Sequence, residues 1–283
     1  MQTMQKQKMV ITPHAKLWHV DWREIWRYRD LIELFVRRNI VVQYKQTILG
    51  PLWYIIQPVL TVVMNMVVFG GIAKMSTDGI PQALFYMAGN VCWFYFSDCL
   101  TQTSNTFVSN QAMFGKVYFP RLAVPIANVL SNLLRFSIQM GLFFVFYLYF
   151  ILIGSGIGPN WYLLLFPFFV LIMAGLGLGF GILISSMTTK YRDLTILFTF
   201  VVQLWMYGTP IVYPLSMIPD GMLRLLILAN PMTPIIEAFK YATLGQGFFS
   251  WPALGYSFTF MCVLLLFGIV IFNKVQRSFM DTV

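Results

Sequence analysis

The chain has 283 residues, of which 58% are hydrophobic and only 10% are charged, and its formal net charge is +9. A soluble domain usually has about 25% charged residues, so this chain has too little polar surface to cover a globule in water. The composition therefore excludes a soluble globular protein and predicts a multi-pass membrane protein.

The basic residues are concentrated in the amino-terminal part. Nine of the 19 Lys and Arg residues precede Gly50, and long uncharged stretches follow. A basic protein is a candidate for nucleic-acid binding. These charges lie beside membrane segments, however, where the positive-inside rule and anionic lipid account for them. We therefore expect contact with membrane lipid and no nucleic-acid partner.

The sequence DWREIWRYRDLIELFVRR, residues 21–38, predicts an amphipathic helix within a cytoplasmic segment formed by residues 1–50. Asp21 is suited to cap the helix and Glu24 follows three residues later, as in a capping box. Apolar side chains cover about half of the circumference. The helix suits the inner membrane surface, or alternatively packs on the protein's own cytoplasmic loops. Arg29 and Glu33 are spaced to pair.

The next stretch contains two helix-modifying pairs, Gly50-Pro51 and Gln57-Pro58. Glycine permits unusual backbone angles and proline is favoured in the first turn of a helix, so Gly50-Pro51 predicts a corner between the interface helix and the membrane. Pro58 removes a backbone hydrogen bond and bends its helix. This bend either shapes a passage or serves packing.

A helix needs roughly 20 apolar residues to cross the hydrocarbon core of a membrane. The apolar stretches predict an all-α protein with a six-span transmembrane domain over residues 51–273 and a cytoplasmic tail over 274–283. The expected spans are residues 51–73, 83–104, 126–153, 161–186, 194–213 and 252–273.

The positive-inside rule orients these spans. With six of them, 15 of the 19 basic residues fall on the side of the two termini, and the opposite side has only Lys74, Arg224 and Lys240. This asymmetry predicts that both termini are cytoplasmic. A five-span arrangement would divide the basic clusters between the two sides. Asp98 and Arg135 fall inside spans at similar depth, and we expect them to form a structural pair or to contact a substrate.

Four motifs occur in order along the chain: YKQTILGPLWYIIQPVL (residues 44–60), FGKVYFPRLAVP (114–125), KYRDL (190–194) and NPMTPIIEAFK (230–240). Together they resemble the membrane permease subunit of ABC transporters that export lipid-linked polysaccharide, namely O-antigen, capsule and, more distantly, teichoic acid. The resemblance covers nearly the whole chain. It implies an inner-membrane homodimer that moves lipid-linked glycan, most readily O-antigen, with two copies of an ABC ATPase subunit docked on its cytoplasmic face.

The chain lacks a G-x-x-x-x-G-K-[ST] sequence, so its own residues offer no phosphate-binding loop of that kind. We expect no enzymatic activity, no metal site and no cofactor in this chain. ATP and magnesium are expected on the partner subunit.

Two cytoplasmic loops are candidates for coupling to the ATPase. Aromatic, Met and Arg residues are typical interface anchors, although a positive-inside loop with membrane-anchoring aromatics has the same composition. The candidate coupling residues are Met113, Phe114, Lys116, Tyr118, Phe119, Pro120, Arg121, Tyr191, Arg192 and Asp193.

Aromatic faces stack on the apolar faces of sugar rings, and the hydroxyl of Tyr and the ring N–H of Trp form hydrogen bonds. A stripe on the second span is a candidate lining of a glycan passage, and packing inside the bundle is the alternative. The candidates are Trp53, Tyr54, Phe85, Tyr86, Trp93, Phe96, Trp205 and Tyr207.

The stretch from Pro210 to Gly247 is too rich in proline for a simple span and too apolar for a free loop. It predicts two short helices that dip into the outer leaflet and return, which requires burial in protein or a cavity. They act as an outer gate or as a static plug. The candidate gate residues are Pro231, Pro234, Glu237 and Lys240, of which the last two are spaced to pair.

Gly175, Gly177, Gly179 and Gly181 form two G-x-x-x-G pairs on the fourth span. They predict close helix packing, within one subunit or at a dimer seam.

Three other functions remain as alternatives. They are an ABC permease for a different cargo such as a drug or small lipid, a secondary transporter or channel, and a membrane enzyme. A membrane histidine base or ligand is ruled out because His14 and His19 both precede the first span.

Overall fold

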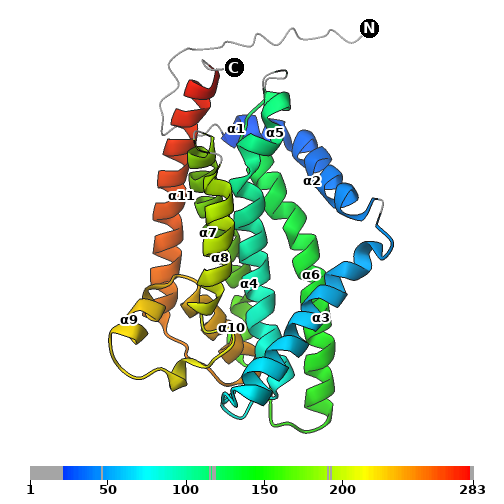
Figure 1. Cartoon of the computed structure of the whole chain (residues 1–283), viewed down its shortest axis with the longest axis vertical. Coiled ribbons are helices and arrows are strands. Elements are labelled where there is room, and N and C mark those ends of the chain that lie inside the picture. Colours follow the sequence, from blue (N-terminus) through cyan, green and yellow to red (C-terminus); the bar gives the residue numbers. More distant parts are fainter. Residues whose placement is uncertain are drawn as a thin grey trace.

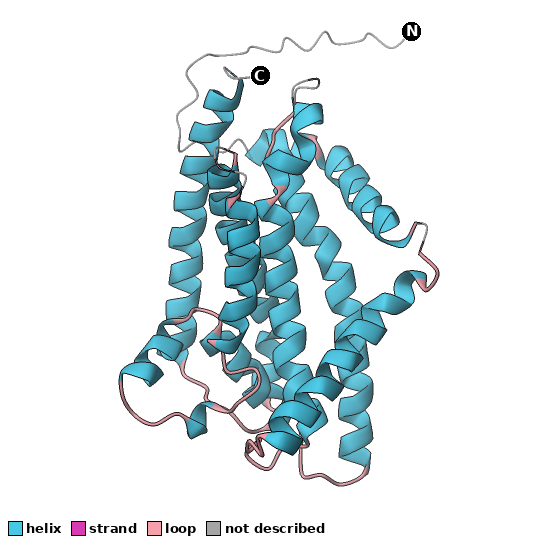
Figure 2. Ribbon diagram, viewed as in Figure 1, coloured by secondary structure: helices cyan, strands magenta, loops and turns pink. Residues whose placement is uncertain are grey.

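The computed structural model describes residues 22–45, 47–114, 116, 119–189, 191 and 193–280. Its regular elements in these ranges are all helices (Figure 2), which confirms the all-α prediction. The longer ones are α2 (Arg29–Tyr44), α3 (Trp53–Asn65), α4 (Gln82–Ser104), α6 (Ala123–Leu152), α7 (Phe166–Thr188), α8 (Leu194–Tyr207), α10 (Thr233–Leu244) and α11 (Trp251–Met280). The shorter ones are α1 (Trp22–Arg27), η1 (Gly50–Leu52), the π-helix η2 (Met66–Ile72), α5 (Thr106–Phe114), η3 (Trp161–Leu165), η4 (Leu215–Met217) and α9 (Met222–Ala229).

The long helices form one bundle. In Figure 1, α4, α6, α7, α8 and α11 run along the long axis and α3 crosses in front of α6. One end of the bundle carries α1, α2 and α5, and we call it the α2 end. The opposite end carries α9 and α10, and we call it the α10 end. A large apolar core with members on most of these helices lies between the two ends.

Four segments are long and apolar enough to cross a membrane, and a bent helix pair brings the number to at most five among the described residues. These segments are Gly50–Ile72, Ala123–Leu152, Trp161–Thr188 and Trp251–Val275. They match the predicted first, third, fourth and sixth spans closely. The protein is therefore a multi-pass membrane protein.

The predicted second and fifth spans correspond to α4 and α8. The 23 residues of α4 are long enough to cross, but they include polar side chains such as Asn90 and Asp98 and are mostly buried inside the bundle. The 14 residues of α8 rise only about 21 Å. This helix ends at Tyr207, earlier than predicted, because Gly208 and the residues before Pro210 leave the helical conformation. The six-span count stays a prediction.

The predicted interface helix is divided in two. Tyr28 interrupts it between α1 and α2, and Arg29 pairs with the neighbouring Asp30 rather than with Glu33. Phe35 is buried among side chains of other helices, whereas Trp22 and Trp26 are 65% and 71% exposed. Both interpretations of this segment therefore have support, because one part of its apolar face packs on the protein and another part is open.

The glycines of α7 allow close packing on two sides, within this one chain. A Cβ added at Gly177 would lie 2.6 Å from the Cβ of Cys99 on α4, and one at Gly179 would lie 2.9 Å from Leu264 on α11. Gly181 and Gly175 face the same two helices in the same order. One G-x-x-x-G pair thus seats α7 against α4, and the other seats it against α11.

Replacing Gly177 by Ala is expected to lower the free energy of unfolding by about 1–3 kcal/mol, because the new methyl group meets backbone atoms of α4 that cannot move aside. Gly141→Ala is the matched control, since Gly141 is also helical and has open space around it. The control should melt at the wild-type temperature or slightly above it. Thermal unfolding of the detergent-purified proteins measures both, and equal melting of the two variants would contradict this packing.

Candidate functional site

The corner predicted at Gly50-Pro51 is present. Gly50 has a φ of +48°, a conformation that favours glycine, and Pro51 lies in the helical turn that follows. The hydroxyl of Tyr54 donates a hydrogen bond to the side-chain oxygen of Gln43 on α2. Trp53 is 47% exposed beside it. The corner therefore fixes α2 to the start of the first span.

The guanidinium of Arg135 on α6 joins three helices. Its Nη1 lies 2.9 Å from Oδ2 of Asp98 on α4, which confirms the predicted pair. Its Nη2 donates to the side-chain oxygen of Gln57 on α3 at 3.0 Å, and its Cζ lies 5.3 Å from the ring centroid of Tyr54. A polar residue at position 57 is thus explained, because it accepts a hydrogen bond from a cation inside the bundle. We call these four residues the Arg135 clamp.

Amide side chains continue from this clamp toward α2. Asn39 of α2 donates to Asn128 of α6 at 2.9 Å, and Asn128 donates to the backbone oxygen of Gln102 at 3.1 Å. Gln102 in turn donates to Asn132 at 2.9 Å. Hydrogen bonds between amides hold polar groups inside an apolar bundle at a defined register. The interface helix is therefore connected to α4 and α6 by a row of polar contacts.

In the direction of the α10 end, α3, α4 and α6 carry buried polar atoms for which the described residues supply no hydrogen-bond partner. Such atoms need a partner such as water or a ligand group. They belong to Asn65, Tyr86, Asn90, Gln139 and Tyr147.

The predicted aromatic stripe of α4 lies in the core of the bundle. Phe85, Tyr86, Trp93 and Phe96 are at most 2% exposed. Trp93 and Phe96 lie against Trp205 of α8, with ring centroids 6.0 and 5.3 Å away. Within a single chain in this conformation these rings pack on other helices. Their role in a passage stays a prediction.

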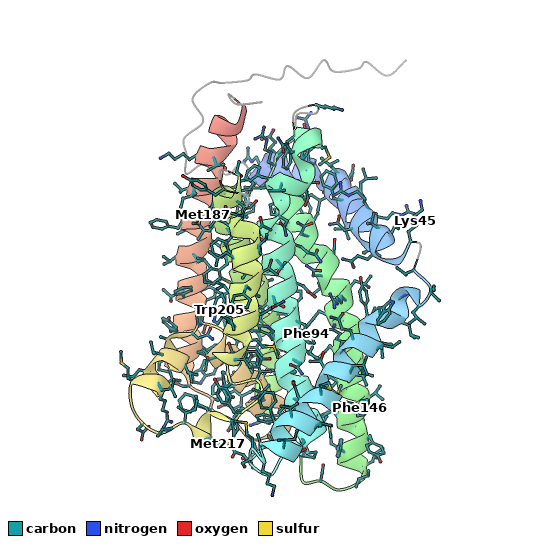
Figure 3. The ribbon with its side chains drawn as sticks, viewed as in Figure 1. Lys45, Phe94, Phe146, Met187, Trp205 and Met217 are labelled. Carbon is teal, nitrogen blue, oxygen red and sulfur yellow. The ribbon has the colours of Figure 1, made fainter. Side chains whose placement is uncertain are left out.

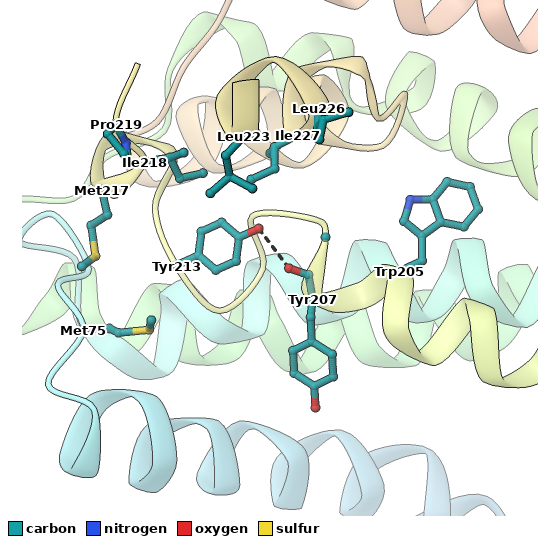
Figure 4. Close-up of a pocket in the computed structure, with 11 residues that line it drawn as sticks. Met75, Trp205, Tyr207, Tyr213, Met217, Ile218, Pro219, Leu223, Leu226 and Ile227 are labelled. Atoms are coloured by element: carbon teal, nitrogen blue, oxygen red, sulfur yellow. Dashed lines mark hydrogen bonds between the residues drawn. The ribbon is translucent and has the colours of Figure 1, made fainter. Parts of the chain in front are cut away.

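Trp205 and Tyr207 border an apolar cavity of ≈600 Å³ at the α10 end. Figure 4 shows Tyr213 below Leu223 of α9 and beside Tyr207, with the Tyr213 hydroxyl donating to the backbone oxygen of Tyr207 at 3.0 Å. The side chains of Trp205, on α8, and Met217, beyond it toward the α10 end, are also seen in Figure 3. This cavity is large enough for a small ligand and is lined mainly by apolar groups.

The two short helices predicted after Pro210 are confirmed. They are α9 and α10, bent by 84° at a short break that contains Pro231. Pro234 lies in the first turn of α10, where a missing N–H costs nothing. Asn230, in the break, donates to the backbone oxygen of Gly208 at 3.2 Å and to Thr209 Oγ1 at 2.8 Å. The irregular chain after α8 is therefore held by the bent helix pair, which we call the α9–α10 hairpin.

Glu237 and Lys240 form the predicted ion pair on α10, with a separation of 3.3 Å and side chains only 3% and 1% exposed. Lys240 Nζ also donates to the backbone oxygen of Pro210 at 2.5 Å and lies 3.9 Å from the ring centroid of Phe85. A buried ammonium group needs several such partners. Lys240 thus connects α10 to α4 and to the chain that follows α8.

At the α2 end, the predicted coupling residues divide into buried and exposed groups. Phe114 and Phe119 are buried with Phe35 of α2. The ring centroid of Phe119 lies 5.6 Å from that of Phe35 and 5.6 Å from that of Phe114. The guanidinium of Arg121 lies 5.4 Å from the ring of Phe114, and burial lowers the pKa of Arg121 below the ordinary arginine value. Arginine stays protonated at neutral pH, so this small core contains a cation. Met113 and Pro120 are partly buried.

Lys116, Tyr191 and Asp193 are exposed at the same end. Asp193 also accepts a hydrogen bond from the backbone N–H of Leu194 at the start of α8. Tyr118 and Arg192 lie outside the described residues. The exposed residues lie on the surface of this end, and the buried ones support the loop from beneath.

Sequence reasoning missed Asn230 and Tyr213. The signal for Asn230 was the Asn-Pro pair, which favours a turn in which the side chain bonds to nearby backbone. Tyr213 gave no periodic signal, because its partner is a backbone oxygen of a helix that ends earlier than predicted. Among the described residues, no group of three or more His, Cys, Asp or Glu side chains is placed to hold a metal ion.

These features define a class of protein, a helical membrane protein with a charged clamp inside its bundle, a bent helix pair at one end and a loop core at the other. Residues 30–244 match the family described as ABC-2 type transporter, and the chain belongs to this family.

Curated proteins similar to this chain are also named as transport proteins. The O-antigen export system permease protein RfbA of Myxococcus xanthus is 28% identical over 221 residues, which is 77% of this chain and 82% of that protein. Two proteins of the same name from Klebsiella pneumoniae are each 25% identical, and the alignments cover 89% of this chain and 94% of those proteins.

Removing one partner of the Asp98–Arg135 pair should destabilise the protein strongly. Asp98→Asn is expected to lower the free energy of unfolding by about 3–5 kcal/mol because it leaves Arg135 uncompensated inside the bundle. Adding Arg135→Gln should recover part of the loss. The exposed Asp220–Arg224 pair is the matched control, and Asp220→Asn should cost at most about 1 kcal/mol. Unfolding in mixed detergent micelles measures this cycle, and additive costs for Asp98 and Arg135 would show that the pair is not coupled.

Proposed function

We propose that this chain is the permease subunit of an ATP-driven exporter that moves lipid-linked polysaccharide, most specifically O-antigen, across the inner membrane. The observation that carries the proposal is the similarity to proteins named O-antigen export system permease over 82–94% of their length. Membership of the ABC-2 type transporter family supports an ABC ATPase as the source of energy. ATP and magnesium are then bound by that partner subunit, and this chain supplies the path.

The proposed assembly is a homodimer with two ATPase subunits. Its orientation follows the positive-inside rule, so that the α2 end and both termini are cytoplasmic and the α10 end is the outer side. The helices α4 and α8 run parallel to the apolar spans (Figure 1). This arrangement is consistent with the proposal of six membrane crossings per chain. Among the proposed spans, the first (Gly50–Ile72) and α8 are the least covered by the rest of the chain, and Val202 is the one buried residue of α8. Their exposed apolar faces fit contact with the second copy. Examples are Leu60, Met64, Phe200 and Leu204.

The glycan path is proposed to lie beside α3, α4 and α8. The buried polar atoms of Asn65, Asn90 and Gln139 are available to hydrogen-bond sugar hydroxyls once α3 moves aside. The aromatic rings of α4 and Trp205 then present faces for weak stacking. Weak contacts suit a passage, because a transported chain has to leave each site as readily as it enters. The α9–α10 hairpin closes the outer mouth of this path.

A different cargo, such as a drug or small lipid, is the second candidate, and the apolar cavity beside Trp205 favours it. Transport by the permease and its ATPase reconstituted in proteoliposomes separates the two. The exporter proposal expects ATP-dependent appearance of lipid-linked glycan on the far side. Transport of a lipophilic dye with no glycan movement would replace it by the second candidate.

Coupling is proposed to run from the exposed Tyr191 and Lys116 into the buried aromatic core around Phe119. Phe119→Ala removes the ring that joins α2 to the loop after α5. The variant, like Arg121→Ala, should still insert but export about tenfold less glycan per ATP hydrolysed, within the usual range of coupling free energies. Export and ATP hydrolysis are measured together in proteoliposomes.

Phe169→Ala serves as the control, because Phe169 is equally buried but lies in the bundle core away from the loop. It should lower the melting temperature without changing the ratio of export to hydrolysis in the folded fraction. An unchanged ratio in Phe119→Ala would remove the loop core from the coupling path.

A further inference from the structure

A second cavity at the α10 end differs from the apolar one in its chemistry. It has a volume of ≈240 Å³ and lies between the turn that precedes α4, the chain around η4, the α9–α10 hairpin and the loop after α10. Charged and aromatic side chains line it together. The lining includes Asp78, Phe85, Arg224, Glu237, Lys240 and Phe248.

Two of the charges are buried and fixed. Glu237 uses one carboxylate oxygen for Lys240 at 3.3 Å, and its other oxygen accepts a hydrogen bond from the backbone N–H of Phe248 at 3.2 Å. Lys240 is held in addition by the backbone oxygen of Pro210. This pair is neutral overall and forms a rigid polar wall.

The other two charges reach the cavity from its rim. Asp78 has a φ of +52° in a turn where Thr77 Oγ1 donates to the backbone oxygen of Ile80 at 2.6 Å. Such a conformation is costly for a residue other than glycine, and the turn holds it in place. Ser216 donates to Asp78 Oδ2 at 2.7 Å. Arg224, from α9, also pairs with the exposed Asp220.

The chemistry of this lining selects a particular ligand class. Two carboxylates face two cations, so neither an anion nor a cation is favoured by net charge. Donors and acceptors are interleaved, and Phe85 and Phe248 add aromatic surface. A sugar ring has hydroxyls that both donate and accept, and an apolar face that stacks on aromatic rings. The volume is below the usual range of about 300–1,000 Å³ for drug-sized ligands, which suits a single ring.

We propose that this cavity is an exit subsite for one uncharged sugar ring of the exported glycan. The inference rests on the proposed function for the identity of the cargo. It adds that the glycan touches α9 and α10 directly as it leaves, since Arg224 belongs to one helix of the hairpin and Glu237 and Lys240 belong to the other.

The test uses the full chain in lipid nanodiscs, with methyl α-glucoside and methyl α-mannoside as probes and saturation-transfer NMR as the measurement. Wild-type protein should bind at least one of them, and inorganic phosphate should not compete. Phe248→Ala should weaken binding about tenfold through the lost aromatic contact, while the backbone bond to Glu237 remains. Phe258→Ala is the matched control, because Phe258 is 37% exposed compared with 44% for Phe248 and lies on α11.

Asp78→Asn is the second variant. It keeps an oxygen that accepts the hydrogen bond from Ser216 but removes the carboxylate, so sugar binding should weaken while the melting temperature stays unchanged. Absence of pyranoside binding to wild-type protein, or equal binding by wild type and Phe248→Ala, would overturn the subsite. Glycan export by the wild-type complex, measured in parallel, decides the proposed function separately, because an exporter without this subsite still exports.

Discussion

The fold depends most on how the bundle accommodates the cation of Arg135 inside a membrane. A charge at this depth is tolerated only with close polar partners, and Arg135 finds them on other helices in Asp98, Gln57 and the ring of Tyr54. Because Tyr54 is also bonded to Gln43, the position of α2 relative to the first span depends on the same group. One guanidinium therefore sets the register of α3, α4 and α6 and links that register to the interface helix.

The same requirement operates at the other end of the molecule. The chain leaves α8 after 14 residues and continues without regular structure as far as η4, so its backbone oxygens there need partners that lipid does not provide. Asn230 and Lys240 supply them from the α9–α10 hairpin. The hairpin and the broken span consequently depend on each other, and a movement of one has to move the other.

The sequence predicted the spans 51–73, 126–153, 161–186 and 252–273, because uninterrupted apolar runs and charge asymmetry are strong signals. Similar depth within the predicted spans indicated the pair Asp98–Arg135, and local spacing indicated the pair Glu237–Lys240. The sequence did not predict that Tyr28 would divide the interface helix. It also did not predict that α8 would end at Tyr207, because the apolar run continues past Gly208 and Pro210 to Tyr213. The sequence also could not predict which helix the aromatic stripe of α4 contacts. Helical periodicity shows that residues share one face, but it does not show which neighbour that face packs against.

The distribution of polar groups along α4 suggests how such a protein conducts a hydrophilic polymer without leaking. Toward the α2 end, two polar residues of α4 are paired, in Gln102–Asn132 and Asp98–Arg135, whereas the hydroxyl of Thr103 is buried without a partner among the described residues. Toward the α10 end, Tyr86 and Asn90 are buried without a partner among the described residues. An unsatisfied buried amide or hydroxyl costs about 1–3 kcal/mol, so this conformation carries that cost at Tyr86 and Asn90. In the proposed exporter, a glycan that formed hydrogen bonds to these groups would stabilise the conformation that admits it.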